Sequence, residues 1–107
     1  MKKLAIIIPA YKPRFLQETL DSIAKQNSHE FTVYIGDDAS PYPLKTIVDH
    51  YKNKFDIIYH RFEQNMGKKD LPGHWERCIS LSEEELIWLF SDDDLMPFDL
   101  SLIHIWR

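Results

Sequence analysis

The stretch LAIII at residues 4–8 decides the fold class, because it is a continuous apolar run rich in β-branched residues. Such a run is typical of a strand that is buried on both faces, as in a parallel sheet covered by helices. Leu16, Leu20 and Ile23 then recur at helical spacing. This spacing predicts an amphipathic helix over residues 14–26. The chain therefore opens with a buried strand followed by a helix.

The same alternation continues to residue 90. Apolar runs predict three further strands, at residues 31–35, 56–62 and 85–90. Helical spacing predicts one helix around residues 44–51 and another over residues 70–81, with Asp70 as its N-cap. The order β-α-β-α-β-α-β is typical of a Rossmann-like α/β fold, a mostly parallel sheet with helices on both faces.

Composition and charge limit the class of protein. The chain has 107 residues, 44% of them apolar and 13% aromatic, which suits one small globular domain. A net charge of −4 gives no electrostatic footprint for a nucleic acid partner. Cys78 is the single cysteine, so an internal disulfide is excluded and a reducing compartment is indicated.

The amino-terminal apolar stretch does not fit a secretory signal. It has at most seven residues, contains Pro9, and is followed at once by Lys12 and Arg14. No run approaches the ~20 apolar residues of a membrane span. We therefore expect a cytoplasmic protein without a membrane span; the cytoplasmic face of a membrane is the alternative location.

Three consecutive carboxylates, Asp92, Asp93 and Asp94, come directly after the apolar run at residues 86–90. They repel one another, and folding alone does not require them. Ligands of open α/β sheets bind at the carboxyl edge of the strands, and Mg²⁺ or Mn²⁺ prefers oxygen ligands. The triplet therefore indicates a site for a metal and a phosphate. A solvated turn is the alternative, because Asp is a common turn former.

Other polar and aromatic residues follow the strands that should end at the same edge. Asp37 and Asp38 come after the second strand, where an acid can bind a ribose hydroxyl or simply form a turn. Pro9 and Tyr11 follow the first strand. The Tyr11 ring can stack on a nucleobase or pack on the first helix.

Residues 65–69 form a loop whose glycine suits a tight turn and whose two lysines could meet a diphosphate; a charged surface loop is the alternative. His74 and Arg77, near the start of the third helix, are placed to face the cleft. Trp75 and Cys78 are interpreted as core residues. The sequence has no zinc-ligand spacing, no P-loop and no Gly-x-Gly-x-x-Gly motif.

Five motifs in order carry a family likeness: IIIPAY at 6–11, Leu-x-x-x-Leu-x-Ser-Ile-x-x-Gln at 16–26, IGDDAS at 35–40, Asn-x-Gly at 65–67 and SDDD at 91–94. Together they resemble the family 2 glycosyltransferases of the GT-A fold. The likeness extends over residues 3–97, nearly the whole chain.

The resemblance implies an inverting transferase that uses a nucleotide-diphospho-sugar donor and Mg²⁺ or Mn²⁺. Its acceptor would be a glycan or a lipid-linked molecule, as in the synthesis of polysaccharides or cell-wall glycans. Carried over from the family, Pro9, Tyr11 and Asp38 would hold the nucleotide.

The aspartate motif of the family is usually Asp-x-Asp, and the triplet here permits two registers. Asp94 is the metal ligand if Asp92 opens the motif, whereas Asp93 is the ligand if Ser91 takes the first position. The resemblance thus assigns Asp92 and Asp93 to the donor, and Asp93 and Asp94 to the metal.

The family also has a longer chain than this one. Residues 1–99 are expected to form a nucleotide-sugar-binding half-domain of a truncated protein, followed by a tail at 100–107 that does not resemble the family. The general base would lie beyond Arg107, so the catalytic residues are unknown and the fragment is expected to bind donor only. A receiver-like Mg²⁺ module, a nucleotidyltransferase of the same fold and an inactive truncated product are the alternatives.

Overall fold

The computed structural model describes residues 4–26 and 30–90. Its four strands form one sheet in the order β3-β2-β1-β4, and every pairing is parallel. The strands are β1 (Leu4–Ala10), β2 (Phe31–Asp37), β3 (Asp56–Arg61) and β4 (Leu86–Leu89). The parallel α/β sheet expected from the sequence is confirmed.

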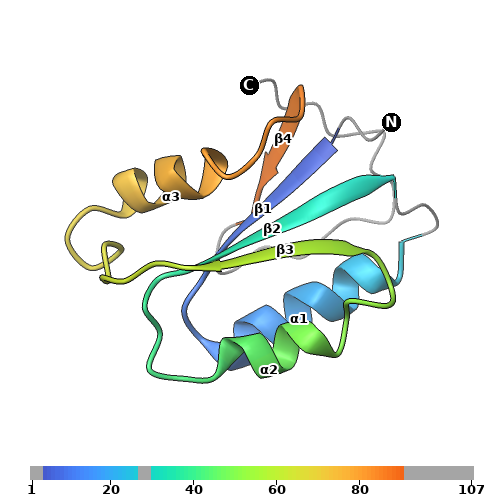
Figure 1. The fold of residues 1–107 in the computed structure, drawn as a ribbon, viewed down its shortest axis with the longest axis horizontal. Coiled ribbons are helices and arrows are strands. Elements are labelled where there is room, and N and C mark those ends of the chain that lie inside the picture. The colour runs from blue at the N-terminus through green and yellow to red at the C-terminus, as the bar shows by residue number, and fades with distance from the viewer. Residues whose placement is uncertain (1–3, 27–29, 91–107) are drawn as a thin grey trace.

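Three helices connect the strands and cover both faces of the sheet (Figure 1). They are α1 (Pro13–Ala24), α2 (Leu44–Asp49) and α3 (Leu71–Ile79). Helices α1 and α2 lie on one face and α3 on the other. Among the described residues, no helix has the length and apolar character needed to cross a membrane.

Two hydrophobic clusters, one on each face, hold these layers together. Ile6 and Ile8 of β1 pack with buried residues of α1 and α2, whereas Ala5 and Ile7 pack with Cys78 of α3. Alternate residues of β1 thus enter opposite cores, and all four are 0% exposed. The double burial explains why the run at residues 4–8 is apolar throughout.

Strands β1 and β2 are longer than the sequence predicted. Pro9 and Ala10 belong to β1 and pair with Gly36 and Asp37, although the two strands were predicted to end at Ile8 and Ile35. Proline has no backbone N–H to donate. The backbone groups of residues 7 and 9 point to the same side of β1, and on that side the Ile7 carbonyl accepts the Phe90 N–H at 2.8 Å. The missing N–H of Pro9 therefore faces the β4 side, where the described pairing has already ended at Ile7.

Helix α3 begins and packs as its sequence indicates. The Asp70 carboxylate accepts the Gly73 N–H at 3.0 Å, which confirms Asp70 as the N-cap. A side chain at Gly36 would collide with the Cys78 sulfur and lie 3.1 Å from the Phe62 ring. Glycine at position 36 therefore allows α3 to approach β2 closely. The helix around residues 44–51 is shorter than expected, because it ends at Asp49.

Candidate functional site

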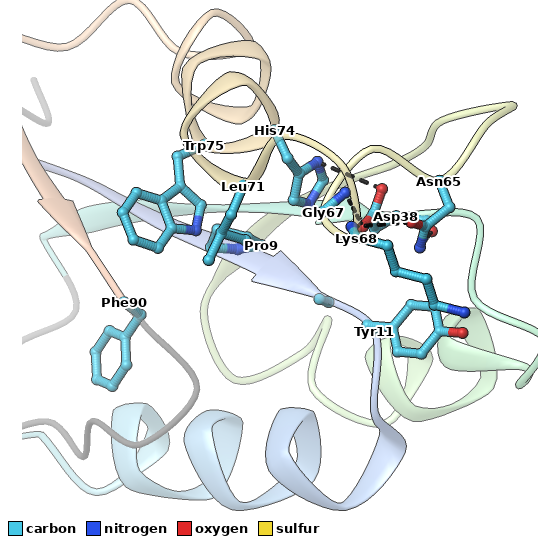
Figure 2. Close-up of a pocket in the computed structure, with 11 residues that line it drawn as sticks. Pro9, Tyr11, Asp38, Asn65, Gly67, Lys68, Leu71, His74, Trp75 and Phe90 are labelled. Carbon is cyan, nitrogen blue, oxygen red and sulfur yellow. Dashed lines mark hydrogen bonds and ion pairs between the residues drawn. The ribbon is translucent and has the colours of Figure 1, made fainter.

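A cavity of about 450 Å³ lies at the carboxyl ends of β1 and β2. Its walls come from the loop after β1, the turn after β2, residues 65–68 and α3 (Figure 2). Pro9, Tyr11 and Asp38, all expected from the sequence to hold the nucleotide, line it together with Lys68 and His74. Topology has therefore gathered residues from four segments at one edge of the sheet.

The Asp38 carboxylate organises the floor of this cavity. Its Oδ1 accepts the Met66 N–H at 2.7 Å, and its Oδ2 accepts the Gly67 N–H at 2.9 Å. The Asn65 side chain donates to the Asp38 carbonyl at 3.0 Å. A Cβ at Gly67 would lie 2.6 Å from Asp38 Oδ2, so glycine lets the loop come this close. The loop at residues 65–67 is thus built directly on Asp38.

Asp37 lies in a different environment. Its side chain is 0% exposed and accepts hydrogen bonds from the Tyr59 hydroxyl, the Arg61 guanidinium and the Ser40 N–H. Burial, followed by the hydrogen bond to Asp37, raises the pKa of Tyr59. Of the two acids after Ile35, Asp38 alone lines the cavity. Both acids lie at the carboxyl end of β2, as the sequence predicted, but only Asp38 contributes to the cavity.

The half-buried Tyr11 forms one side of the cavity. Its carbonyl accepts the Ser40 hydroxyl at 2.6 Å, which fixes the loop after β1 to the turn after β2. Ala39 in that turn has φ +54°, a left-handed conformation that is uncommon outside glycine. The Lys68 ammonium lies 5.8 Å from the centre of the Tyr11 ring (Figure 2). The Tyr11 ring and the Lys68 ammonium thus lie close together in the cavity wall.

Helix α3 supplies the remaining wall. Arg77 donates to Asp38 Oδ1 at 2.7 Å, to the Gln64 carbonyl at 2.9 Å and to His74 Nδ1 at 3.0 Å. His74 is 2% exposed, and burial lowers its pKa. His74 therefore lines the cavity as expected, whereas Arg77, which was expected to face it too, is not among the lining residues and instead holds Asp38.

Two apolar residues of α3 line the cavity without having been expected there. Trp75 was interpreted as core, but it is half-buried and faces the cavity, as does Leu71 (Figure 2). The only sequence signal for this role is that both residues are apolar and lie near the start of α3. Core residues of α3 have the same character, so the signal does not distinguish the two roles. The interpretation of Cys78 as core is confirmed, since it is 0% exposed and burial raises its pKa to about 12.

Asp92, Asp93 and Asp94 lie outside the described residues. Among residues 4–26 and 30–90, no group of three or more His, Cys, Asp or Glu side chains could hold a metal ion. Phe90, the last described residue, lines the cavity and precedes the triplet by two positions.

A family model described as glycosyl transferase family 2 matches residues 5–105. The chain belongs to glycosyl transferase family 2. This membership removes the receiver-like module and the nucleotidyltransferase from the alternatives that the sequence left open.

Among relatives of this family 2 chain is the poly(ribitol-phosphate) beta-N-acetylglucosaminyltransferase TarS of Staphylococcus aureus, in strains Mu50 and MW2. It is 32% identical over 99 residues, which cover 87% of this chain and 17% of TarS. The chain thus spans about a sixth of the length of these curated relatives.

Solved structures confirm the GT-A fold. S. aureus TarS 1–349 in complex with UDP-GlcNAc superposes with a TM-score of 0.74 at 30% identity, over 89% of this chain and 27% of that one. The mannosyltransferase PcManGT from Pyrobaculum calidifontis, in complex with GDP-Man and Mn²⁺, also gives 0.74, over 89% of this chain and 28% of that one. At 19% identity it shows the fold alone.

Proposed function

We propose that this chain is the donor-binding part of a transferase that moves a sugar from a uridine-diphospho-sugar to an acceptor hydroxyl. The observation that carries the proposal is the cavity in which Tyr11, Asp38 and Lys68 stand together. A ring, an acid and a cation correspond to the three parts of a nucleotide: base, ribose or base edge, and phosphate. The similarity to TarS, which was solved with UDP-GlcNAc, favours uridine and N-acetylglucosamine.

The Tyr11 face is the proposed stacking surface for the base. The Asp38 carboxylate can accept one more hydrogen bond. Its Oδ1 already accepts from both Met66 and Arg77, whereas its Oδ2 accepts only from Gly67. The imide N–H of uracil is such a donor. Asp38 would then read the base while its other hydrogen bonds hold the loop in place.

The Lys68 ammonium, which lines the cavity, is proposed to meet the diphosphate. Asp93 and Asp94 would hold Mg²⁺ or Mn²⁺ on that diphosphate, with Asp92 on the sugar or ribose. These side chains suit such an ion, because their carboxylate oxygens are the ligands that hard divalent cations prefer. The bound ion would neutralise charge on the nucleoside diphosphate as it leaves.

Inversion would require one direct displacement, with a general base taking the proton of the acceptor hydroxyl. None of the described residues is assigned that role. The acceptor is proposed to be a glycan or a lipid-linked glycan, by analogy with the poly(ribitol-phosphate) in the name of TarS.

A thermal-shift panel tests the donor proposal. The 107-residue chain is melted with UDP-GlcNAc, GDP-mannose or a dTDP-sugar, each with Mn²⁺ or with excess chelator. We expect the largest rise in melting temperature with UDP-GlcNAc and Mn²⁺, because ligands stabilise the state they bind. Asp94→Ala should lose the metal-dependent part, while Asp49→Ala, on the exposed side of α2, should keep it. No shift with any donor would contradict the proposal.

A further inference from the structure

His74 is almost completely buried, and one of its ring nitrogens has a defined partner. The Arg77 Nε–H donates to His74 Nδ1 at 3.0 Å. A guanidinium can only donate hydrogen bonds, so Nδ1 must carry a lone pair. His74 is therefore neutral in this arrangement, with its proton on Nε2, which lies 3.7 Å from the Cys78 sulfur.

The guanidinium held by His74 is the centre of a bridge between three segments. Its Nη2 donates to Asp38 after β2 and to the Gln64 carbonyl before the cavity loop. Its Cζ atom lies over the Phe62 ring, 3.9 Å from the ring centre. Asp38 in turn accepts hydrogen bonds from the backbone amides of Met66 and Gly67. A change in the orientation of Arg77 would therefore alter the loop that lines the cavity.

We infer that His74 is a positioning residue: its neutral imidazole fixes Arg77 on Asp38 and so keeps the donor cavity in its binding shape, and protonation of His74 releases this arrangement. The inference rests on the proposed function for its effect on donor affinity. A protonated Nδ1 would point an N–H at the Arg77 Nε–H and place a second cation beside the first. It would also compete for Asp38 Oδ1, which lies 3.7 Å from Nδ1.

The groups packed around His74 set the direction of its titration. Burial is the largest influence and lowers the pKa; Asp38 and Asp37 from β2 act against it, and Arg77 from α3 acts with it. The Cys78 thiol and the edge-on Phe62 ring complete the surroundings without charge. Since the pKa lies below its usual value of 6.5, the folded chain binds fewer protons than the unfolded chain in the window between them. Stability should therefore be full above about pH 6.5 and fall as the pH is lowered. Donor affinity should fall at lower pH, where His74 becomes protonated in the folded chain.

Nitrogen NMR of the His74 ring tests the first half of the inference without any donor. At about pH 7.5, the ring should show an unprotonated Nδ1 and a protonated Nε2, and the Arg77 Nε–H signal should be shifted by its hydrogen bond. On acidification, that Arg77 signal should move as His74 titrates. A ring with its proton on Nδ1, or an Arg77 signal indifferent to His74, would overturn the inference whether or not a donor binds.

Two variants test the second half. His74→Leu removes the acceptor, whereas His74→Asn places an amide oxygen near the position of Nδ1 and cannot be protonated. His74→Leu should lose about tenfold in affinity for UDP-GlcNAc, as expected for losing a hydrogen bond to a charged group, and His74→Asn should recover most of it.

The pH profile separates positioning from simple packing. As the pH is lowered below about 6.5, the wild type should lose donor affinity, whereas His74→Asn, which has no ring to protonate, should show a flatter profile. Equal profiles, or equal losses in the Asn and Leu variants at matched melting temperature, would overturn the inference. If the wild type binds no donor at all, the proposed function fails, and the Arg77 signal in the Asn variant, which should no longer respond to pH, still decides the role of His74.

Discussion

Asp37 and Asp38 are neighbours in the sequence and carry the same side chain, but their carboxylates contact different parts of the molecule. Asp37, the last residue of β2, is fully buried and joins Tyr59, Arg61 and the Ser40 amide. Asp38 lies beside the cavity and holds the loop amides and Arg77. The first carboxylate stabilises the corner between β2 and β3; the second shapes a ligand site.

The two roles depend on where β2 ends. Successive side chains of a strand point to opposite faces. Because β2 continues to Asp37, its side chain and that of Asp38 separate. A pair of acids that reads as one motif is therefore two sites, which substitution can separate.

The largest effect is expected from Asp37→Ala. The change removes the acceptor for the Tyr59 hydroxyl, the Ser40 amide and the Arg61 guanidinium. It should therefore lower the free energy of unfolding by about 2–4 kcal/mol. Urea denaturation measures it, with Asp49→Ala as the exposed control. A loss no larger than that of the control would remove the structural role assigned to Asp37.

Asp38→Asn should affect binding more than folding. An amide cannot accept from Met66, Gly67 and Arg77 at both oxygen positions, so the loop should loosen and UDP affinity should fall by about tenfold to a hundredfold. Calorimetry with UDP measures the affinity, and urea denaturation should show a smaller loss of stability than in Asp37→Ala. The opposite ranking of the two variants would reverse the comparison.

Gly36→Ala tests whether α3 must approach β2 closely to form the Asp38 side. The added methyl would meet the Cys78 sulfur, and we expect a loss of about 1–2 kcal/mol, in the range of overpacking. Cys78→Ala in the same chain should recover part of that loss by removing the sulfur. Strictly additive effects of the two changes would show that the contact does not limit packing.

Lys68→Met should have the smallest effect. It removes the cation above the Tyr11 ring and should weaken UDP binding about threefold at low salt, with less difference at high salt. Lys69→Met is the matched control, since Lys69 is exposed and does not line the cavity. An equal effect of both variants would mean that the field of the loop acts without a specific contact.

Much of the fold could be predicted because local patterns and burial agree. The run at residues 4–8 is apolar since both faces of β1 are covered, and the N-cap role of Asp70 follows from its place before α3. The strand ends were not predictable locally. Pro9 and Gly36 are residues that usually interrupt strands, but the register between β1 and β2 continues through both.

Only part of the site could be predicted from the sequence. The sequence placed Tyr11, Asp38 and His74 near one edge, because topology alone brings strand ends and their loops together. It could not show that Asp37 is buried, that Trp75 faces the cavity, or that Arg77 joins His74 to Asp38, because these depend on packing between α3 and β2.

The cavity on the Asp38 side is proposed to receive the nucleotide. Amide NMR of the 107-residue chain titrated with UDP tests it most directly. We expect concentration-dependent shifts centred on Tyr11, Gly67 and Lys68, with the amides of Tyr59 and Arg61 beside Asp37 nearly unchanged. Shifts centred on Tyr59 and Arg61, or no shifts at millimolar UDP, would contradict the account.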